Sequence, residues 1–258
     1  MKKDKILIVG AGLCGTLLAL RMAQRGYNVE LREKRSDIRA AEFVGGRSIN
    51  LALSDRGLKA LRAAGMEEQI LKECIPMHGR MIHGVDGALR LSKYSGRENE
   101  YINSVSRGGL NVALLEKADK FDNLTVVFNS SCTNVDLETG TAHFKNQDGT
   151  EETIVADVVI GTDGAGSAVR RSMMSRTTDL LFNYSQDFLR TGYKELEIPP
   201  AENGGFRIEK NALHIWPRGS LMLIALPNLD GSFTVTLFLS HDEGEYNFSN
   251  LTTPEKVT

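Results

Sequence analysis

The stretch Lys5-Ile-Leu-Ile-Val9, followed directly by Gly10-Ala-Gly-Leu-Cys-Gly15, decides the fold of this chain. The first five residues form a short apolar run typical of a strand buried on both faces. Thr16–Gln24 has apolar residues at the three- and four-residue spacing of a helix, and Val29–Glu33 is a predicted second strand that ends on an acid. This order predicts a βαβ unit with its glycines spaced for binding a dinucleotide.

Each glycine of the loop has its own physical role. Gly10 makes the tight turn out of the strand, and Gly12 lets a pyrophosphate approach the backbone N–H groups that begin the helix. Gly15 allows the helix to pack closely on the sheet. An ordinary glycine-rich turn would not explain the acid at position 33, so the spacing favours a nucleotide site.

Glu33 bears on which dinucleotide is bound. A carboxylate at this position accepts hydrogen bonds from ribose hydroxyls and repels a 2′-phosphate, so we expect FAD or NAD rather than NADP in the loop. The basic neighbours Arg32, Lys34 and Arg35 weaken this argument, because they could tolerate a phosphate.

The composition is that of an ordinary soluble globular protein with one large or two modest domains. Of its 258 residues, 41% are hydrophobic and 25% charged. The 31 basic and 33 acidic residues include no long basic block, which argues against nucleic-acid binding. No apolar run approaches the roughly 20 residues that span a bilayer, and the first strand begins too early for a signal peptide, so we expect a cytoplasmic protein. The 3 cysteines and 5 histidines are scattered, and no metal site is expected.

A hairpin is predicted after the first helices. Gly79–His83 and Leu89–Tyr94 alternate with a period of two and flank Asp86-Gly87, a turn signal. Arg80 and Tyr94 would then stand on paired strands, where a guanidinium and a phenol suit a carboxylate. The alternative is a solvated arginine beside a half-buried tyrosine.

A second ligand-binding motif follows a predicted helix over Leu110–Phe121 and several short strands. Asp157–Gly161 is a predicted buried strand, followed by Thr-Asp163-Gly and a helix that starts near Ala165. An acid at the carboxyl end of a parallel strand lies in the crevice where α/β proteins hold ligands, so Asp163 is a candidate site residue.

The last third of the chain predicts a second, antiparallel sheet. Its strands are expected at 187–198, 212–216, 220–226 and 232–239. Alternation places Ile224 and Leu226 on one face, and Thr236 and Phe238 together on a face of the next strand. Such apolar stripes usually form core, and lining of a pocket is the alternative.

Three motifs together resemble those of the single-component flavin-dependent aromatic monooxygenases, whose fold is that of para-hydroxybenzoate hydroxylase. They are the glycine loop with Glu33, the stretch that ends at Arg107, and Gly161–Arg170. Five further stretches resemble the branch of this family that hydroxylates L-kynurenine. These are Gly46–Ser54, Arg80–His83, Ser104–Arg107, Leu213–Arg218 and Ile224–Asn228.

The resemblance implies an FAD site and a substrate site. At the FAD, Cys14 would lie beside the pyrophosphate, and Arg32, Glu33, Lys34 and Arg35 at the adenosine. Ala52, Arg107 and Cys132 match other flavin-contacting positions, and Asp163 matches an acid tied to the pyrophosphate region and to NADPH use. Arg80 and Tyr94 match the pair that holds the substrate carboxylate. Leu213, Ile224, Leu226 and Phe238 match apolar positions around the substrate ring.

The implied reaction depends on the cofactor, so no catalytic side chain is expected. NADPH would reduce FAD, O2 would add to give a C4a-hydroperoxide, and L-kynurenine would be hydroxylated to 3-hydroxykynurenine in tryptophan degradation. Two alternatives stay open: an FAD-dependent hydroxylase of another aromatic substrate, and a dinucleotide-binding fragment without activity. A homodimer is also left open. An NAD-dependent dehydrogenase is disfavoured by Asp163-Gly164.

The fold class expected is α/β: a Rossmann-like FAD-binding domain with a second, mainly antiparallel sheet domain for the substrate. We expect residues 1–75 and 101–178 in the first domain, and residues 76–100 and 179–258 in the second. Members of the family continue into a Gly-Asp motif over the flavin and a C-terminal helical region. We therefore expect this chain to be the N-terminal part of a longer protein, with any membrane anchor beyond it.

Overall fold

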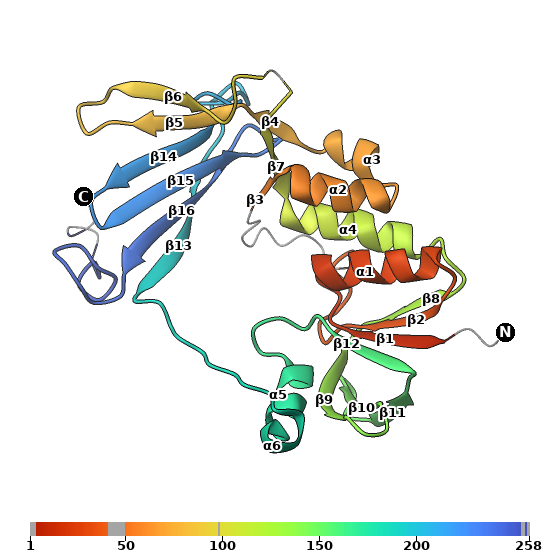
Figure 1. Cartoon of the computed structure of the whole chain (residues 1–258). Coiled ribbons are helices and arrows are strands. Elements are labelled where there is room, and N and C mark those ends of the chain that lie inside the picture. Colours follow the sequence, from red (N-terminus) through yellow and green to blue (C-terminus); the bar gives the residue numbers. More distant parts are fainter. Residues whose placement is uncertain (1–3, 41–49, 98, 254–255, 257–258) are drawn as a thin grey trace. The chain divides into compact units, whose positions relative to one another are not determined.

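The computed structural model describes residues 4–40, 50–97, 99–253 and 256 (Figure 1). The chain divides into two compact units. The first comprises Met1–Val44, Leu61–Met66 and Gly108–Ser185, and the second comprises Gly45–Ala60, Glu67–Arg107 and Gln186–Thr258. This division reflects which residues contact one another. It does not test which residues bind cofactor or substrate, so the predicted functional domain boundaries stay a prediction. Residues 46–49 of the family-like stretch lie outside the described residues.

The first unit is built on a parallel sheet in the order β12-β1-β2-β8 (Figure 1). Its strands are β1 (Lys5–Val9), β2 (Asn28–Arg32), β8 (Leu124–Val127) and β12 (Val158–Gly161). Helix α1 (Leu13–Gln24) connects β1 to β2 and completes the predicted βαβ unit. Leu7 and Ile8 have no exposed surface, which confirms that β1 is buried on both faces. The predicted α/β class is therefore confirmed.

A three-stranded antiparallel sheet in the order β11-β10-β9 completes the first unit together with its remaining helices. The strands are β9 (Ser130–Asp136), β10 (Thr141–Asn146) and β11 (Glu151–Val155), and the helices are α4 (Arg107–Ala118, from Gly108 on), α5 (Ala168–Met174) and α6 (Thr177–Leu180). Phe144 of β10 and Val135 of β9 share a buried cluster with Leu7 of β1 and Val169 of α5. The two sheets of this unit therefore share one apolar core.

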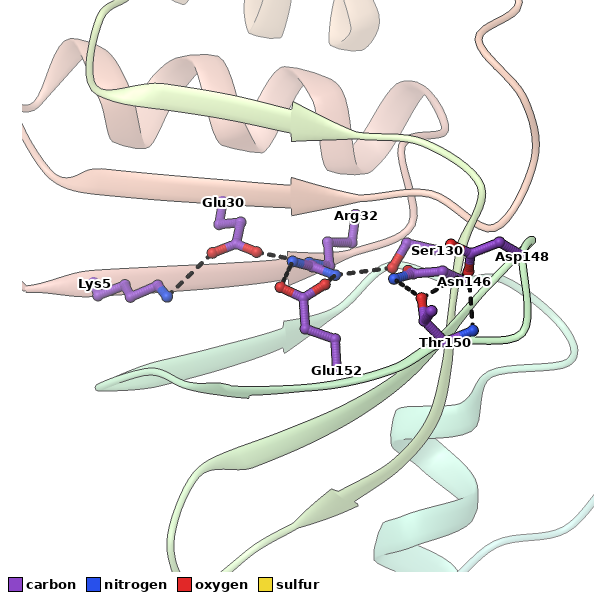
Figure 2. Close-up of polar contacts among 8 residues, drawn as sticks. All are labelled: Lys5, Glu30, Arg32, Ser130, Asn146, Asp148, Thr150 and Glu152. Atoms are coloured by element: carbon purple, nitrogen blue, oxygen red, sulfur yellow. Dashed lines mark hydrogen bonds and ion pairs between the residues drawn. The ribbon is translucent and has the colours of Figure 1, made fainter.

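An ion-pair network centred on Arg32 joins these two sheets (Figure 2). The Arg32 side chain is 4% exposed, and its guanidinium donates to Glu30 at 2.6 Å and to both carboxylate oxygens of Glu152 at 2.7 and 2.9 Å. It also donates to the Ser130 hydroxyl at 2.9 Å and lies over the Phe144 ring. Hydrogen bonding to Arg32 lowers the pKa of Glu152. A buried cation of β2 is thus neutralised by carboxylates from its own strand and from β11.

The second unit contains a six-stranded sheet in the order β13-β16-β15-β14-β5-β6. Its strands are β5 (Gly79–His83), β6 (Leu89–Lys93), β13 (Thr191–Ile198), β14 (Leu213–Arg218), β15 (Leu221–Pro227) and β16 (Phe233–Ser240). All neighbours are antiparallel except β14 and β5, which pair in parallel with Leu213 beside Arg80. The predicted hairpin therefore extends the predicted second sheet.

A small sheet in the order β3-β7-β4 packs beside the large one in this unit. Its strands are β3 (Asn50–Leu53), β4 (Ile75–Met77) and β7 (Ile102–Ser106), and helices α2 (Asp55–Ala63) and α3 (Glu67–Leu71) lie between β3 and β4 in the chain. Met77 and Ile102 pack against Leu213 and Leu226 on one face of the large sheet. Phe206 packs with Phe233 on its opposite face. Both faces of the large sheet are thus at least partly covered.

Two sequence-based expectations differ from the structure. The first strand of the second sheet begins at Thr191 instead of Asp187, and Phe188 and Leu189 before it are more than 80% exposed. The three strands of the small sheet were not predicted, because each has three to five residues and pairs with a partner remote in sequence.

Prediction for the Arg32 network. Replacing Arg32 by Ala should lower the free energy of unfolding by about 2–4 kcal/mol, because Glu30 keeps a largely buried charge without its main partner. Arg176→Ala is the matched control: its ion pairs with Glu138 and Asp179 are exposed, and their loss should cost less than about 1 kcal/mol. Urea unfolding of the two variants measures the difference. Equal losses would show that burial adds nothing to the Arg32 network.

Candidate cofactor and substrate sites

The glycine loop holds α1 unusually close to the ends of β1 and β12. Gly10 has φ +102°, and a Cβ built on it would lie 2.7 Å from the carbonyl oxygen of Thr162. A Cβ on Gly15 would overlap the carbonyl oxygen of Gly10 and the hydroxyl of Thr162. Neither position admits a side chain, and this agrees with the roles predicted for both glycines.

The first turn of α1 presents free space and backbone donors. Gly12 precedes the helix in an extended conformation (φ −73°, ψ −179°), and a Cβ built on it would meet no protein atom within 4 Å. No side chain among the described residues caps this turn. Cys14 lies in the same turn and is exposed. Uncapped N–H groups and the positive end of the helix dipole suit an anion such as a pyrophosphate, so the loop fits the predicted cofactor.

Glu33 lies against this loop. Its Oε2 accepts a hydrogen bond from the Ala11 N–H at 2.9 Å, and its Oε1 accepts one from the Arg35 N–H at 3.0 Å. The carboxylate is therefore oriented before any ligand binds, at the place expected for a ribose contact. The side chains of Lys34 and Arg35 are exposed beside it.

Two other residues predicted at the cofactor have side chains engaged elsewhere. The Arg32 guanidinium is bound within the network described above, and the Cys132 side chain is 9% exposed in the core of the first unit. Burial, followed by the charge of Asp163, raises the pKa of the Cys132 thiol to about 11. Their cofactor roles stay predictions, and the geometry gives both side chains a part in the core.

The second motif lies beside the glycine loop. The Thr162 hydroxyl is within hydrogen-bond distance of the carbonyls of Val9 and Gly10, at 2.9 and 2.8 Å. Asp163 Oδ2 accepts the Ala168 N–H at 2.6 Å, and its Oδ1 is buried without a hydrogen-bond partner in the part of the chain that the structure describes. A buried acceptor without a partner costs free energy, which a bound donor would recover.

The remaining cofactor candidates belong to the second unit. Ala52 is exposed on β3, where it pairs with Ser104 of β7. Arg107 is exposed at the first position of α4, directly after β7. Both residues therefore lie on the small sheet or at its end, and their contact with flavin stays a prediction.

All six predicted substrate residues lie on one face of the large sheet. Arg80 pairs with Leu213, and the register of β14, β15 and β16 continues the same face through Ile224, Leu226 and Phe238. Tyr94 follows β6 with its N–H on the His78 carbonyl, two residues beyond Ser92, the partner of Arg80. Leu213 and Leu226 are buried, whereas Ile224 and Phe238 are half-exposed, so this face is apolar and partly open.

Arg80 and Tyr94 are in direct contact at the edge of that face. The Arg80 guanidinium carbon lies 5.1 Å from the centre of the Tyr94 ring, a cation–π contact. Arg80 is exposed, and Tyr94 is half-buried. Burial raises the pKa of Tyr94, and the positive charge of Arg80 opposes that rise. The pair keeps a neutral phenol and a guanidinium available to a carboxylate.

Two residues of β13 that were not predicted as site residues lie on the same face. Tyr193 pairs with Phe238, and Glu195 pairs with Thr236. Their only sequence signal is alternation within Thr191–Ile198, and that signal gives no register to the neighbouring strand. They add an aromatic and an acidic group to the end of the face remote from Arg80.

Across the residues that the structure describes, no helix is long and apolar enough to cross a membrane. The same residues contain no cluster of three or more His, Cys, Asp or Glu side chains placed to hold a metal ion.

The fold and the glycine loop define a dinucleotide-binding protein of the α/β class. The FAD binding domain family matches residues 3–186, and this chain belongs to that family. In fold it is similar to 2-methyl-3-hydroxypyridine-5-carboxylic acid oxygenase, with a TM-score of 0.70 at 22% identity over 93% of this chain and 60% of that one. It is also similar to p-nitrophenol 4-monooxygenase of Pseudomonas putida DLL-E4, with a TM-score of 0.73 at 16% identity over 98% and 62%.

In sequence the chain is similar to several kynurenine 3-monooxygenases. That of Dictyostelium discoideum is 49% identical over 252 residues, which cover 98% of this chain and 53% of the relative. That of Sus scrofa is 44% identical over 245 residues, which cover 95% and 51%. The chain thus spans about half the length of the curated relatives it matches.

Prediction for Gly12. Gly12→Ala should weaken FAD binding by at least about tenfold while leaving the free energy of unfolding nearly unchanged, because the added methyl meets no protein atom but narrows the approach to the helix N-terminus. Gly96→Ala is the matched control, since its Cβ also meets no atom within 4 Å and it lies in the second unit. Calorimetric titration with FAD and thermal unfolding separate the two effects. Unaltered FAD affinity in Gly12→Ala would exclude the loop as the pyrophosphate site.

Proposed function

We propose that this chain belongs to a flavoenzyme that hydroxylates L-kynurenine at the 3-position with NADPH and O2. The observation that carries the proposal is the single face of the large sheet that presents Arg80, Tyr94 and the four apolar positions together. The 44–49% identity to kynurenine 3-monooxygenases supports the choice of substrate.

The arrangement of the face suits an aromatic amino acid. Its carboxylate would pair with the Arg80 guanidinium and receive a hydrogen bond from the Tyr94 hydroxyl, and charge-assisted bonds of this kind are stronger than neutral ones. The ring would lie against the half-exposed Ile224 and Phe238, beside the buried Leu213 and Leu226, and burial of their exposed apolar area contributes about 25 cal/mol per Å². Carboxylate anchoring would therefore fix the direction in which the ring lies.

FAD would supply the oxygen-transfer chemistry once bound and reduced. The residues that would hold it in the first unit are Gly10, Gly12, Gly15 and Glu33, with Asp163 beside the loop. The task of the chain's own side chains is to bind, orient and exclude water. An amino group already activates the aromatic ring toward an electrophile, so no protein base has to be assigned.

The proposal is tested by the visible spectrum of the chain with FAD, before and after L-kynurenine is added. Flavin bands that shift with the amino acid would support both sites, and NADPH-dependent formation of 3-hydroxykynurenine would complete the case. Bound flavin that responds to a different aromatic acid and ignores kynurenine would point to another hydroxylase. Flavin bands identical to those of free FAD would contradict the proposed FAD site in this chain.

Prediction for Arg80. Arg80→Ala should raise the KM or the Kd for L-kynurenine by more than about tenfold, because the carboxylate loses its charged partner, with little change in FAD content. The control is Lys93→Ala, which removes an exposed cation of the adjacent strand on the opposite face. Kinetics or spectral titration of both variants would measure the difference. Equal affinities for wild type and Arg80→Ala would remove the carboxylate assignment.

A further inference from the structure

A hydrogen-bonded histidine pair lies on the opposite face of the large sheet, directly behind the proposed substrate face. His83 Nε2 and His214 Nδ1 are 2.8 Å apart, and His214 Nε2 is 2.7 Å from the carbonyl oxygen of Glu209. A carbonyl can only accept, so His214 carries its proton on Nε2 and accepts at Nδ1. His83 must then donate from Nε2. With His83 Nδ1 unprotonated, both rings are neutral in this arrangement.

The surroundings hold the pair in place. The His83 ring stacks on the Trp216 ring at 4.1 Å and 24°, and the His214 ring meets the edge of Phe233 at 5.6 Å. His214 is 1% exposed. Arg218 Nη1 donates to the His83 carbonyl at 2.9 Å. The end of β5 is therefore tied to β14 by side chains as well as by backbone pairing.

This tie matters because the backbone pairing on the β14 side of β5 is short, although Arg218 also donates to the His83 and Gly84 carbonyls there. Its pairing with β14 spans three residue pairs, from Arg80 beside Leu213 to Ile82 beside Ile215. Its other neighbour is β6, the edge strand of the sheet, whose five residues are all exposed. Arg80 is three residues from His83 on the same short strand, so its position depends on how firmly β5 is held.

We infer that His83 and His214 are positioning residues for the proposed substrate site: their hydrogen bond fixes β5 against β14, keeps Arg80 in place, and is released when both rings are protonated. The inference rests on the proposed role of Arg80 and adds a pH-sensitive element to it. Protonation of one ring leaves a single proton shared between His83 Nε2 and His214 Nδ1, whereas protonation of both rings would place two N–H donors face to face and remove the bond.

The sign of the pH effect follows from the environment. Burial lowers the pKa of both histidines below the ordinary 6.5, and for His83 the nearby His214 and Arg218 lower it further. Glu209 opposes the shift at His214. Another cation on this face is Lys210: it lies over the Phe206 ring, and Phe206 packs on Phe233, the aromatic neighbour of His214. The hydrogen bond of the neutral pair is therefore fully formed above pH 6.5, and it is lost as the pH falls through the lowered pKa values of the two histidines.

The test measures the Kd of L-kynurenine by calorimetry at about pH 7.5 and about pH 4.5, because burial lowers the pKa of both histidines. In the wild type the Kd should rise about tenfold at the lower pH. His83→Gln offers His214 either an amide N–H or, after a flip of the amide, an oxygen, so it can bond His214 in both protonation states. Its Kd should therefore match the wild type at the higher pH and change little between the two. His83→Leu removes the donor and should show a raised Kd at both values.

Two controls make the outcome specific. His143→Gln changes a histidine of the first unit and should leave the pH dependence intact. The amine analogue of kynurenine, which lacks the carboxylate, should bind wild type and His83→Leu equally. A pH dependence that persists in His83→Gln would overturn the inference, even if His83→Leu proves too unstable to measure. If Arg80→Ala does not affect binding, the proposed function fails first, and the two failures are thereby distinguished.

Discussion

The close approach of α1 to the ends of β1 and β12 is the constraint on which the first unit depends. It exists because positions 10 and 15 carry no side chain, so the Gly10 carbonyl, the Thr162 hydroxyl and the first turn of the helix occupy one small volume. That packing points the uncapped helix N-terminus into free space at Gly12, and Glu33 and Asp163 both lie beside the same loop. The same packing that orders the sheet thus builds the nucleotide site.

Strand alternation in the large sheet of the second unit places two different sets of side chains on its two faces. One face carries Arg80, Tyr94 and the apolar positions, and the other carries His83, His214 and Trp216. A one-residue slip of β5 would move Arg80 to the opposite face and His83 to the substrate face, so whatever fixes that strand also fixes the position of Arg80. The parallel backbone pairing of β5 with β14 holds the strand in this register, and the His83–His214 hydrogen bond is a second, titratable attachment.

Local signals in the sequence predicted the βαβ unit, the hairpin at Asp86-Gly87 and the motif around Asp163. Each of these has its strand, turn and glycine within about 30 residues, where periodicity and turn chemistry are informative. The small sheet could not be predicted, because Asn50–Leu53 has no alternation of its own and pairs with residues 103–106. The ion pair of Arg32 with Glu152 could not be predicted either, because a basic residue next to Glu33 is equally well placed to bind a nucleotide. Long-range pairing and side-chain partners were needed for both.

The central claim is that one chain carries a nucleotide site at the glycine loop and a substrate face on the large sheet. Hydrogen–deuterium exchange of the chain, alone, with FAD, and with FAD plus L-kynurenine, tests it most directly. The account predicts that FAD slows exchange at residues 10–16 and 163–169, and that kynurenine then slows exchange at residues 79–94 and 213–226. Protection by FAD that spares the glycine loop, or protection by kynurenine confined to the first unit, would contradict it.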